Sequence, residues 1–192
     1  MPFAGDAHVA VQQISDTDWR LLRSLLYEGR RDPFEVPIDQ ETDFASIPRV
    51  FTWFLPRYGK YTKSAILHDY LWRELVEKEK TLSRIDADGI FRRSMRELDV
   101  AFLRRWIMWS AVRWAALLKE DGRVGWWRES WRVVLLTLLA LPILLPPAAV
   151  ILAALLAFYV LELVFWAPLK LWEVTRKRPT KNVVMPSVRL KT

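Results

Sequence analysis

The sequence predicts a mainly α-helical protein of α+β class, with a small N-terminal β-hairpin and a C-terminal membrane helical hairpin. Three observations indicate this fold. Apolar residues recur at helical spacing between residues 62 and 119, and strand-like runs occur only before that region. Residues 133–161 contain no charged residue. An uncharged apolar run of 18 or more residues is typical of a bilayer span.

This pattern divides the chain into four regions. We expect a flexible arm over residues 1–17, a globular domain over 18–122, a membrane anchor with its flanks over 123–172, and a basic tail over 173–192. The arm has neither the basic start nor the apolar core of a signal peptide. The sequence contains no cysteine, which excludes disulfides and thiolate metal sites.

The strands are expected first in the chain. Two short strands over residues 18–29 and 33–38 would be joined by a charged turn, although the leucines between 21 and 26 also fit a helix. A loop over residues 39–49 would lead into a short helix near Pro48, because proline suits the first helical position.

Longer helices are predicted over residues 62–79, 83–98 and 99–119. Ser83, with Asp86 three residues later, is a candidate N-cap for the second of these helices. The third helix interleaves tryptophans with arginines. It would either lie on a bilayer surface or be a core helix whose arginines are solvated.

The anchor is too long for one straight span. At about 1.5 Å per residue, a helix over residues 133–169 would reach roughly 55 Å, against about 30 Å of hydrocarbon. Pro142 and the tandem Pro146 and Pro147 predict a turn, and hence a hairpin with arms over 131–145 and 148–169. One span over 148–169 after an interfacial segment is the alternative.

Charge predicts where the anchor and tail lie. The net charge is +7, and residues 175–192 contain six Lys or Arg and no acid. Tryptophans and basic residues flank the anchor at both ends, which in a hairpin would place the N-terminal domain and the tail on the cytoplasmic side. The expected partners are the lipid bilayer and anionic lipids rather than nucleic acid.

The histidine content limits the possible chemistry. There are two histidines, His8 in the expected arm and His68, so zinc sites built from several histidines are excluded. Asp88 shares the apolar face of its predicted helix with Phe91 and Met95. If this helix packs antiparallel to the preceding one, Asp88 approaches His68, and a buried carboxylate requires such a partner. Asp86 competes with Asp88 for this position.

The residue after His68 points elsewhere. Asp69 lies about 100° around the helix from His68, toward the loop that contains Thr42, Asp43 and Ser46. A carboxylate that faces loop oxygens is how hard cations such as calcium are held. Calcium bound by Asp69 and Asp43 is therefore our prediction. Thr42, Ser46, Asp86, Tyr70 and Trp72 are expected to support the site.

Three motifs in this order resemble a known group of sequences. TDFASIPR, LHDYLW and RIDADGIF, within roughly residues 19–114, resemble a family of uncharacterised proteins from phages and prophages. The resemblance implies a phage or prophage source but no activity. Together with the anchor, this source predicts a location in the bacterial inner membrane or a virion membrane. The resemblance does not extend to the anchor.

A narrower resemblance concerns chemistry. HDYLWRE followed by RIDADGIF is similar to the paired active-site helices of phospholipase A2, particularly the bacterial type. This resemblance implies that His68 activates water, Asp69 binds calcium and Asp88 orients His68. The glycine-rich calcium loop of that family is absent here, so TDFAS would have to replace it, and the family's disulfides are absent too.

Two functions therefore remain open. One is a membrane-anchored, calcium-dependent lipid hydrolase of phospholipase-A2-like design. The other is a non-catalytic phage membrane protein, virion component or lysis-associated protein, in which the same His and Asp side chains form a structural network.

Overall fold

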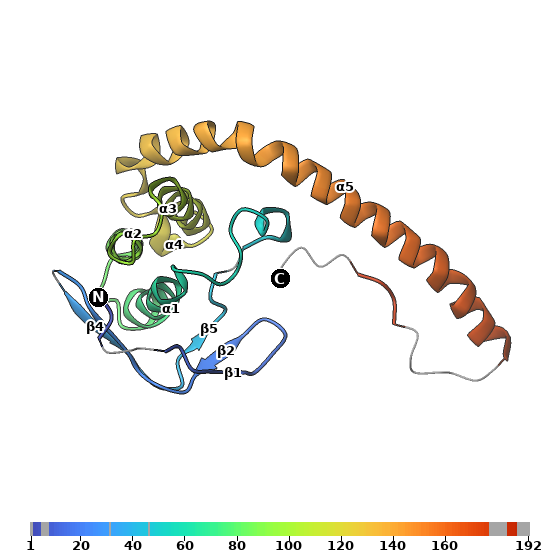
Figure 1. Cartoon of the computed structure of the whole chain (residues 1–192), viewed down its shortest axis with the longest axis horizontal. Helices are drawn as coiled ribbons and strands as arrows, with labels where there is room; N and C mark the ends of the chain where they lie inside the picture. Colours follow the sequence, from blue (N-terminus) through green and yellow to red (C-terminus); the bar gives the residue numbers. More distant parts are fainter. Residues whose placement is uncertain (1, 5–7, 31, 46, 177–183, 188–192) are drawn as a thin grey trace.

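The computed structural model describes residues 2–4, 8–30, 32–45, 47–176 and 184–187. Short strands occupy the N-terminal part, and helices make up most of the remainder of the chain (Figure 1). The long helix α5 (Ser130–Arg176) passes over α3 and then leaves the domain. The predicted mainly helical class with a small N-terminal sheet region is confirmed, and the apolar C-terminal region forms one long helix.

The strands form two small antiparallel sheets. They are β1 (Val11–Gln13), β2 (Trp19–Leu21), β3 (Leu25–Glu28), β4 (Pro33–Val36) and β5 (Glu41–Thr42). β3 and β4 form the predicted hairpin, and the other sheet has the order β1-β2-β5. The single strand predicted over residues 18–29 is two strands. Leu21 and Leu25 are buried but residues 22–24 are exposed, so the chain bends there from one sheet to the other.

The described part of residues 1–17 packs against the domain instead of forming a free arm. Phe3 is 2% exposed and lies against Tyr27, with 5.1 Å between the ring centroids. β1 pairs with β2. Burying a side chain such as that of Phe3 contributes about 1.5–3 kcal/mol, enough to hold this segment in place.

The helices lie close to their predicted positions. They are η1 (Arg49–Phe51), α1 (Thr62–Tyr70), the π-helix η2 (Leu71–Lys78), α2 (Arg84–Glu97), α3 (Phe102–Ala116), α4 (Glu120–Arg123) and η3 (Trp126–Arg128). η2 continues α1 directly. Ser83 is the N-cap of α2, because its side chain accepts a hydrogen bond from the Asp86 backbone at 3.2 Å. This arrangement satisfies a free N–H group of the first turn.

Two clusters of buried apolar side chains connect the strands and helices of the domain. One cluster joins the strands to α1, η2 and α2, and includes Tyr27, Ile66 and Leu71. A second cluster joins α2 to α3 and to α5, and includes Met95 and Met108. α3 is a core helix, since its Trp109 is 1% exposed and its arginine at position 113 is fully buried. The core packing expected in one of the two interpretations is observed, but Arg113 is buried where solvated arginines were expected.

The predicted membrane hairpin is wrong, because α5 is one continuous helix of 47 residues. Each proline removes one hydrogen bond but keeps a φ angle that suits a helix, so the prolines allow the bend in Figure 1 without reversing the chain. Val133 packs with Trp109, and Ala140 packs in the cluster that contains Met108. The segment predicted as the first arm of the hairpin therefore packs its apolar residues against α3. In a hairpin these residues would have packed against the second arm.

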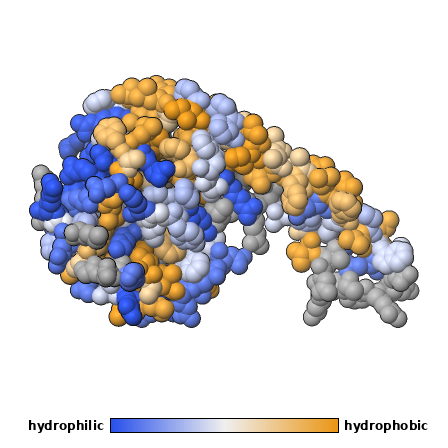
Figure 2. Space-filling model, viewed as in Figure 1, coloured by the Kyte–Doolittle hydropathy of each residue, from blue (hydrophilic) through white to orange (hydrophobic). Residues whose placement is uncertain are grey.

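The outer part of α5 could cross a membrane. Ser130–Glu173 is long and apolar enough by length and composition, and its most apolar 18-residue window has none of its residues buried in the fold. Figure 2 shows apolar surface continuing along the projecting helix. A helix over residues 148–169 would be roughly 33 Å long, which matches a hydrocarbon core of about 30 Å.

Candidate active site

The predicted contact between α1 and α2 is present. His68 Nε2 lies 2.8 Å from Asp88 Oδ1, and both side chains are buried. The Phe91 ring packs on the imidazole with 4.7 Å between centroids, which holds the plane of the ring. Nε2 has this partner, whereas Nδ1 has no hydrogen-bond partner among the described residues. His68 lines a cavity, and Nδ1 is the nitrogen that it can offer there.

Two arginines that the sequence reasoning missed also bind Asp88. Arg84 Nε lies 3.2 Å from Oδ1, and Arg113 Nη1 lies 3.1 Å from Oδ2. The i,i+4 spacing of Arg84 and Asp88 on one helix could have indicated the first contact. No local signal indicated Arg113, which comes from a different helix and is fully buried.

These partners determine the charge on Asp88. Burial by itself would raise the pKa of its carboxyl group, but the hydrogen bond and charge of His68 and the nearby Arg84 and Arg113 hold this pKa below the ordinary value of 3.8. Asp88 is therefore ionised at neutral pH. Asp86 does not compete, since it is exposed and its carboxylate accepts a hydrogen bond from Ser83 at 2.5 Å.

Asp69, which follows His68 in α1, contacts the end of β5 and the loop after it. Thr42 Oγ1 donates to Asp69 Oδ2 at 2.5 Å and accepts a hydrogen bond from the Phe44 backbone at 2.9 Å. Phe44 has a φ of +61°, a left-handed conformation that is rare for a bulky residue and costs on the order of 1–3 kcal/mol. The strained backbone at Phe44 is therefore part of the loop conformation that places Asp43 beside Asp69.

The environment of Asp69 disfavours its charged form. Burial, followed by the negative charge of Asp43, raises the pKa of Asp69 to about 8, although Thr42, Arg73 and the Asp43 backbone each lower it. Two adjacent carboxylates and a hydroxyl are oxygen donors of the kind that calcium prefers. Within the described ranges, no group of three or more His, Cys, Asp or Glu side chains is arranged so that it could hold a metal ion. Calcium takes six to eight oxygens, so backbone carbonyls and water would supply most of them.

The other predicted supporting residues lie in different places. Trp72 lines the His68 cavity, with the guanidinium carbon of Arg84 4.4 Å from its ring centroid. Tyr70 lines a separate surface hollow beside Glu41. Ser46 lies outside the described residues.

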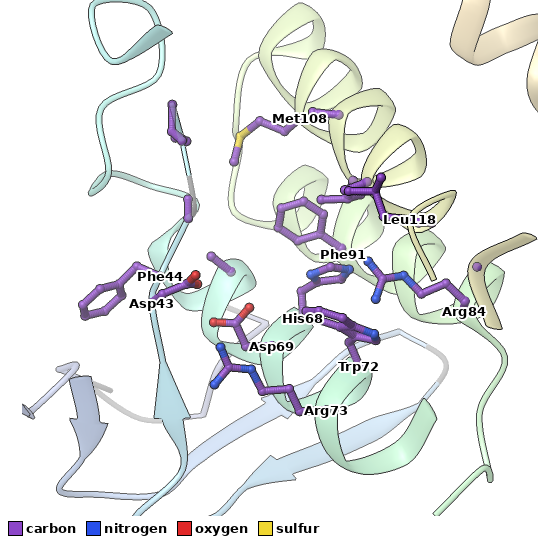
Figure 3. Close-up of a pocket in the computed structure, with 18 of the residues that line it drawn as sticks. Asp43, Phe44, His68, Asp69, Trp72, Arg73, Arg84, Phe91, Met108 and Leu118 are labelled. Carbon is purple, nitrogen blue, oxygen red and sulfur yellow. The ribbon is translucent and has the colours of Figure 1, made fainter. Parts of the chain in front are cut away.

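An apolar cavity of about 320 Å³ opens above His68 and Asp69. Figure 3 shows these two side chains on one side of the cavity and Met108 and Leu118 on the other. Much of the far wall comes from α3 and the segment after it: Met108, Ala111, Val112, Ala115, Ala116 and Leu118. Gly122 also lines the cavity, and a Cβ there would overlap the Ala116 carbonyl. Glycine thus lets α4 pack closely against the end of α3.

The fold and this site define an α+β domain with a His–Asp pair at an apolar cavity and a long apolar helix attached. Residues 19–112 match the model of a family described as a protein of unknown function, DUF1353. Over this segment the chain is similar to that uncharacterised family, in agreement with the three sequence motifs. The match includes His68, Asp69 and Asp88 but not α5. No curated protein and no solved structure matches the chain.

The raised pKa of Asp69 predicts a stability that depends on pH. The unfolded chain ionises this group near pH 3.8, whereas the folded protein keeps it protonated until about pH 8, so this group lowers stability progressively as the pH rises between these values. Asp69→Asn should therefore raise the melting temperature at pH 7.5 and have little effect at pH 4.

The exposed Asp39 offers a matched control, because Asp39→Asn makes the same chemical change outside the site. Thermal melts at the two pH values, with calcium and with chelator, check the prediction. Calcium should raise the melting temperature of the wild type at pH 7.5 and leave that of Asp69→Asn unchanged. An Asp69→Asn variant that is less stable than the wild type at pH 7.5 in chelator would contradict the assignment of a neutral Asp69.

Proposed function

We propose that this protein is a membrane-anchored lipid hydrolase in which His68 is the general base and Asp88 orients it. One observation carries the proposal. Asp88 engages Nε2 of His68 at 2.8 Å, which leaves Nδ1 for an apolar cavity of about 320 Å³. A base of this kind, positioned by a carboxylate at an apolar pocket, suits the activation of water toward an ester.

The reaction would proceed in two steps. Nδ1 of His68 takes a proton from a water molecule as the water oxygen bonds to the ester carbonyl carbon. The tetrahedral intermediate then collapses, the bond to the alcohol oxygen breaks, and the proton passes from His68 to the leaving alcohol. Asp88, held ionised by Arg84 and Arg113, stabilises the imidazolium between the steps. A calcium ion held by Asp69 and Asp43, when bound, would polarise the carbonyl oxygen.

The cavity supports an acyl ester as the substrate class. Its α3 wall carries methyl groups and the Met108 side chain, which suit a hydrocarbon chain. Leu118, at the cavity wall, is 83% exposed, so apolar surface continues from the cavity to the outside. A chain drawn from a bilayer could run along this surface, and α5 would hold the domain at that bilayer.

The direct test measures fatty-acid release from phosphatidylglycerol vesicles by the full-length protein, in calcium and in chelator. We expect release that calcium stimulates and chelator suppresses. A wild-type protein that releases no fatty acid at any calcium concentration would overturn the proposal.

A second function has its own supporting observation. Asp88 is fully buried and bound by His68, Arg84 and Arg113, a network that could serve folding alone. In that case the protein would be a non-catalytic membrane component of a phage or prophage, located in the bacterial inner membrane or a virion membrane. It would show no hydrolysis, and loss of any member of the network would change stability only.

The continuous helix α5 predicts a topology different from that of a hairpin. A single crossing places the N-terminal domain and the C-terminal tail on opposite sides of the membrane. Reporters that are active on only one side of the bacterial inner membrane, fused to the two ends of the chain in turn, should give opposite results. Equal results from both fusions would contradict the single crossing and favour the hairpin.

A further inference from the structure

A second, wider cleft lies beside α2, away from the His68 cavity. Its volume is about 1220 Å³, and it shares none of its lining residues with that cavity. Residues from the turn between β3 and β4, from α2, from α3 and from the segment before α5 form its walls. Five arginines line it: Arg30, Arg92, Arg93, Arg96 and Arg105. The acids in its walls are Asp32, Asp86 and Glu129.

Each of the three acids has a partner outside the set Arg92, Arg96 and Arg105. Asp32 pairs with Arg93 at 3.1 Å, and Asp86 binds Ser83 at the start of α2. Glu129 lies 3.6 Å from a nitrogen of Arg132. Three of the cleft arginines, Arg92, Arg96 and Arg105, have no carboxylate within ion-pair distance in the described part of the chain. We call these three residues the arginine triad.

Two tryptophans in the wall of the cleft, Trp106 and Trp109, pack against Arg92 of the triad. The guanidinium carbon of Arg92 lies 4.0 Å from the ring centroid of Trp106 and 5.5 Å from that of Trp109. Its Nε atom is buried without a hydrogen-bond partner. Stacking on both rings fixes the plane of the guanidinium while its Nη groups remain available to a ligand.

The triad arginines lie close enough to repel one another. Burial lowers the pKa of Arg92 from its ordinary value, Glu129 opposes this effect, and the charges of Arg132, Arg96 and Arg105 lower it further. Like charges gathered in a concave site favour an anion that neutralises several of them. Arg105 also donates to the Val100 carbonyl at 3.2 Å, which fixes its position in the wall.

We propose that this cleft binds a phosphomonoester group through the arginine triad. A phosphate dianion matches the planar guanidinium fork and can accept hydrogen bonds from more than one arginine. The group could belong to a lipid headgroup or to a soluble phosphate ester. Glu129 immediately precedes α5, so the cleft lies at the base of the apolar helix, where headgroups would be found around a spanning α5. The site does not depend on hydrolysis at His68.

Titration calorimetry on the full-length protein in neutral detergent micelles tests this site. The probes are inorganic phosphate, glycerol 3-phosphate and dihexanoyl phosphatidic acid, with dihexanoyl phosphatidylcholine as the phosphodiester comparison. The phosphomonoesters should bind and the phosphatidylcholine should not. The double variant Arg96→Gln, Arg105→Gln should weaken their binding at least about tenfold, because it removes two charge-assisted contacts. Arg92→Lys keeps the positive charge but removes the planar guanidinium group, so it should also weaken the binding of phosphomonoesters.

A matched control removes the same amount of charge elsewhere. Arg23 and Lys60 are exposed and do not line the cleft, so Arg23→Gln, Lys60→Gln should leave the affinity unchanged. Melting curves identify any variant that fails to fold, and Arg92→Lys then serves in place of the double variant. Phosphatidic acid that binds much more tightly than glycerol 3-phosphate assigns the group to a lipid headgroup, and equal affinities assign it to a soluble ester.

Three results would overturn the site. One is equal loss of affinity in the control and cleft variants, which would indicate a general charge effect. Another is the absence of binding by every phosphomonoester. The third is a single-stranded RNA oligonucleotide that binds more tightly than the monoesters and loses affinity in the same cleft variants.

Discussion

Asp88→Ala should lower the free energy of unfolding by about 3–5 kcal/mol, because removing one partner of a buried ion pair leaves the remaining charges uncompensated. Arg113 is fully buried and Arg84 is 6% exposed, so neither guanidinium can turn to water without repacking the interface between α2 and α3. The fall in stability should appear in urea unfolding of the full-length protein in detergent, monitored by circular dichroism.

A control on the same helix separates charge from simple packing. Ser94 is fully buried and donates to the Phe91 carbonyl at 2.9 Å, so Ser94→Ala removes a buried hydrogen bond but no charge. It should cost about 1 kcal/mol. An Asp88→Ala variant at least as stable as Ser94→Ala would show that the arginines do not depend on Asp88.

The same interaction has a defined pH dependence. Because the partners of Asp88 lower its folded-state pKa below the ordinary 3.8, its contribution to stability is fully present above that value and is lost as the pH falls through the lower, folded-state pKa. The stability difference between wild type and Asp88→Ala should thus stay nearly constant from neutral pH down to about pH 5 and shrink only in stronger acid.

His68→Gln should reduce fatty-acid release by about 10²–10⁴-fold, the range that a general base typically contributes. Glutamine approximates the size and polarity of the imidazole but cannot take a proton from water. The measurement is the initial rate of release from phosphatidylglycerol vesicles in saturating calcium, with a melting curve for each protein.

The second histidine of the chain supplies the control. His8 is exposed and lies outside the cavity, so His8→Gln should leave the rate unchanged. The structural-network alternative predicts no measurable rate in any variant and an early melt for His68→Gln. A well-folded His68→Gln protein that hydrolyses lipid at the wild-type rate would remove His68 from the mechanism.

Much of this architecture could be predicted from local patterns. The periodicity of apolar residues located α1, α2 and α3, and Ser83 marked the start of α2. The placement of Asp88 on the apolar face of its helix, together with antiparallel packing of the two helices, predicted its contact with His68. Helical geometry also separated the directions of His68 and Asp69. Such features depend on residues within a few turns of one another, which is the range over which sequence spacing determines direction.

Local spacing in the sequence was sufficient to locate the helices, the long apolar C-terminal segment, and the helix faces that carry His68 and Asp88. The continuation of α5 through its prolines depends on tertiary packing, since the first part of this helix packs on α3. Tertiary structure also decided the burial of Arg113 against Asp88 and the gathering of arginines from residues 30 to 105 in one cleft. These contacts join residues that are far apart in the chain, and their stability comes from burial and charge pairing between separate elements, which no local spacing encodes.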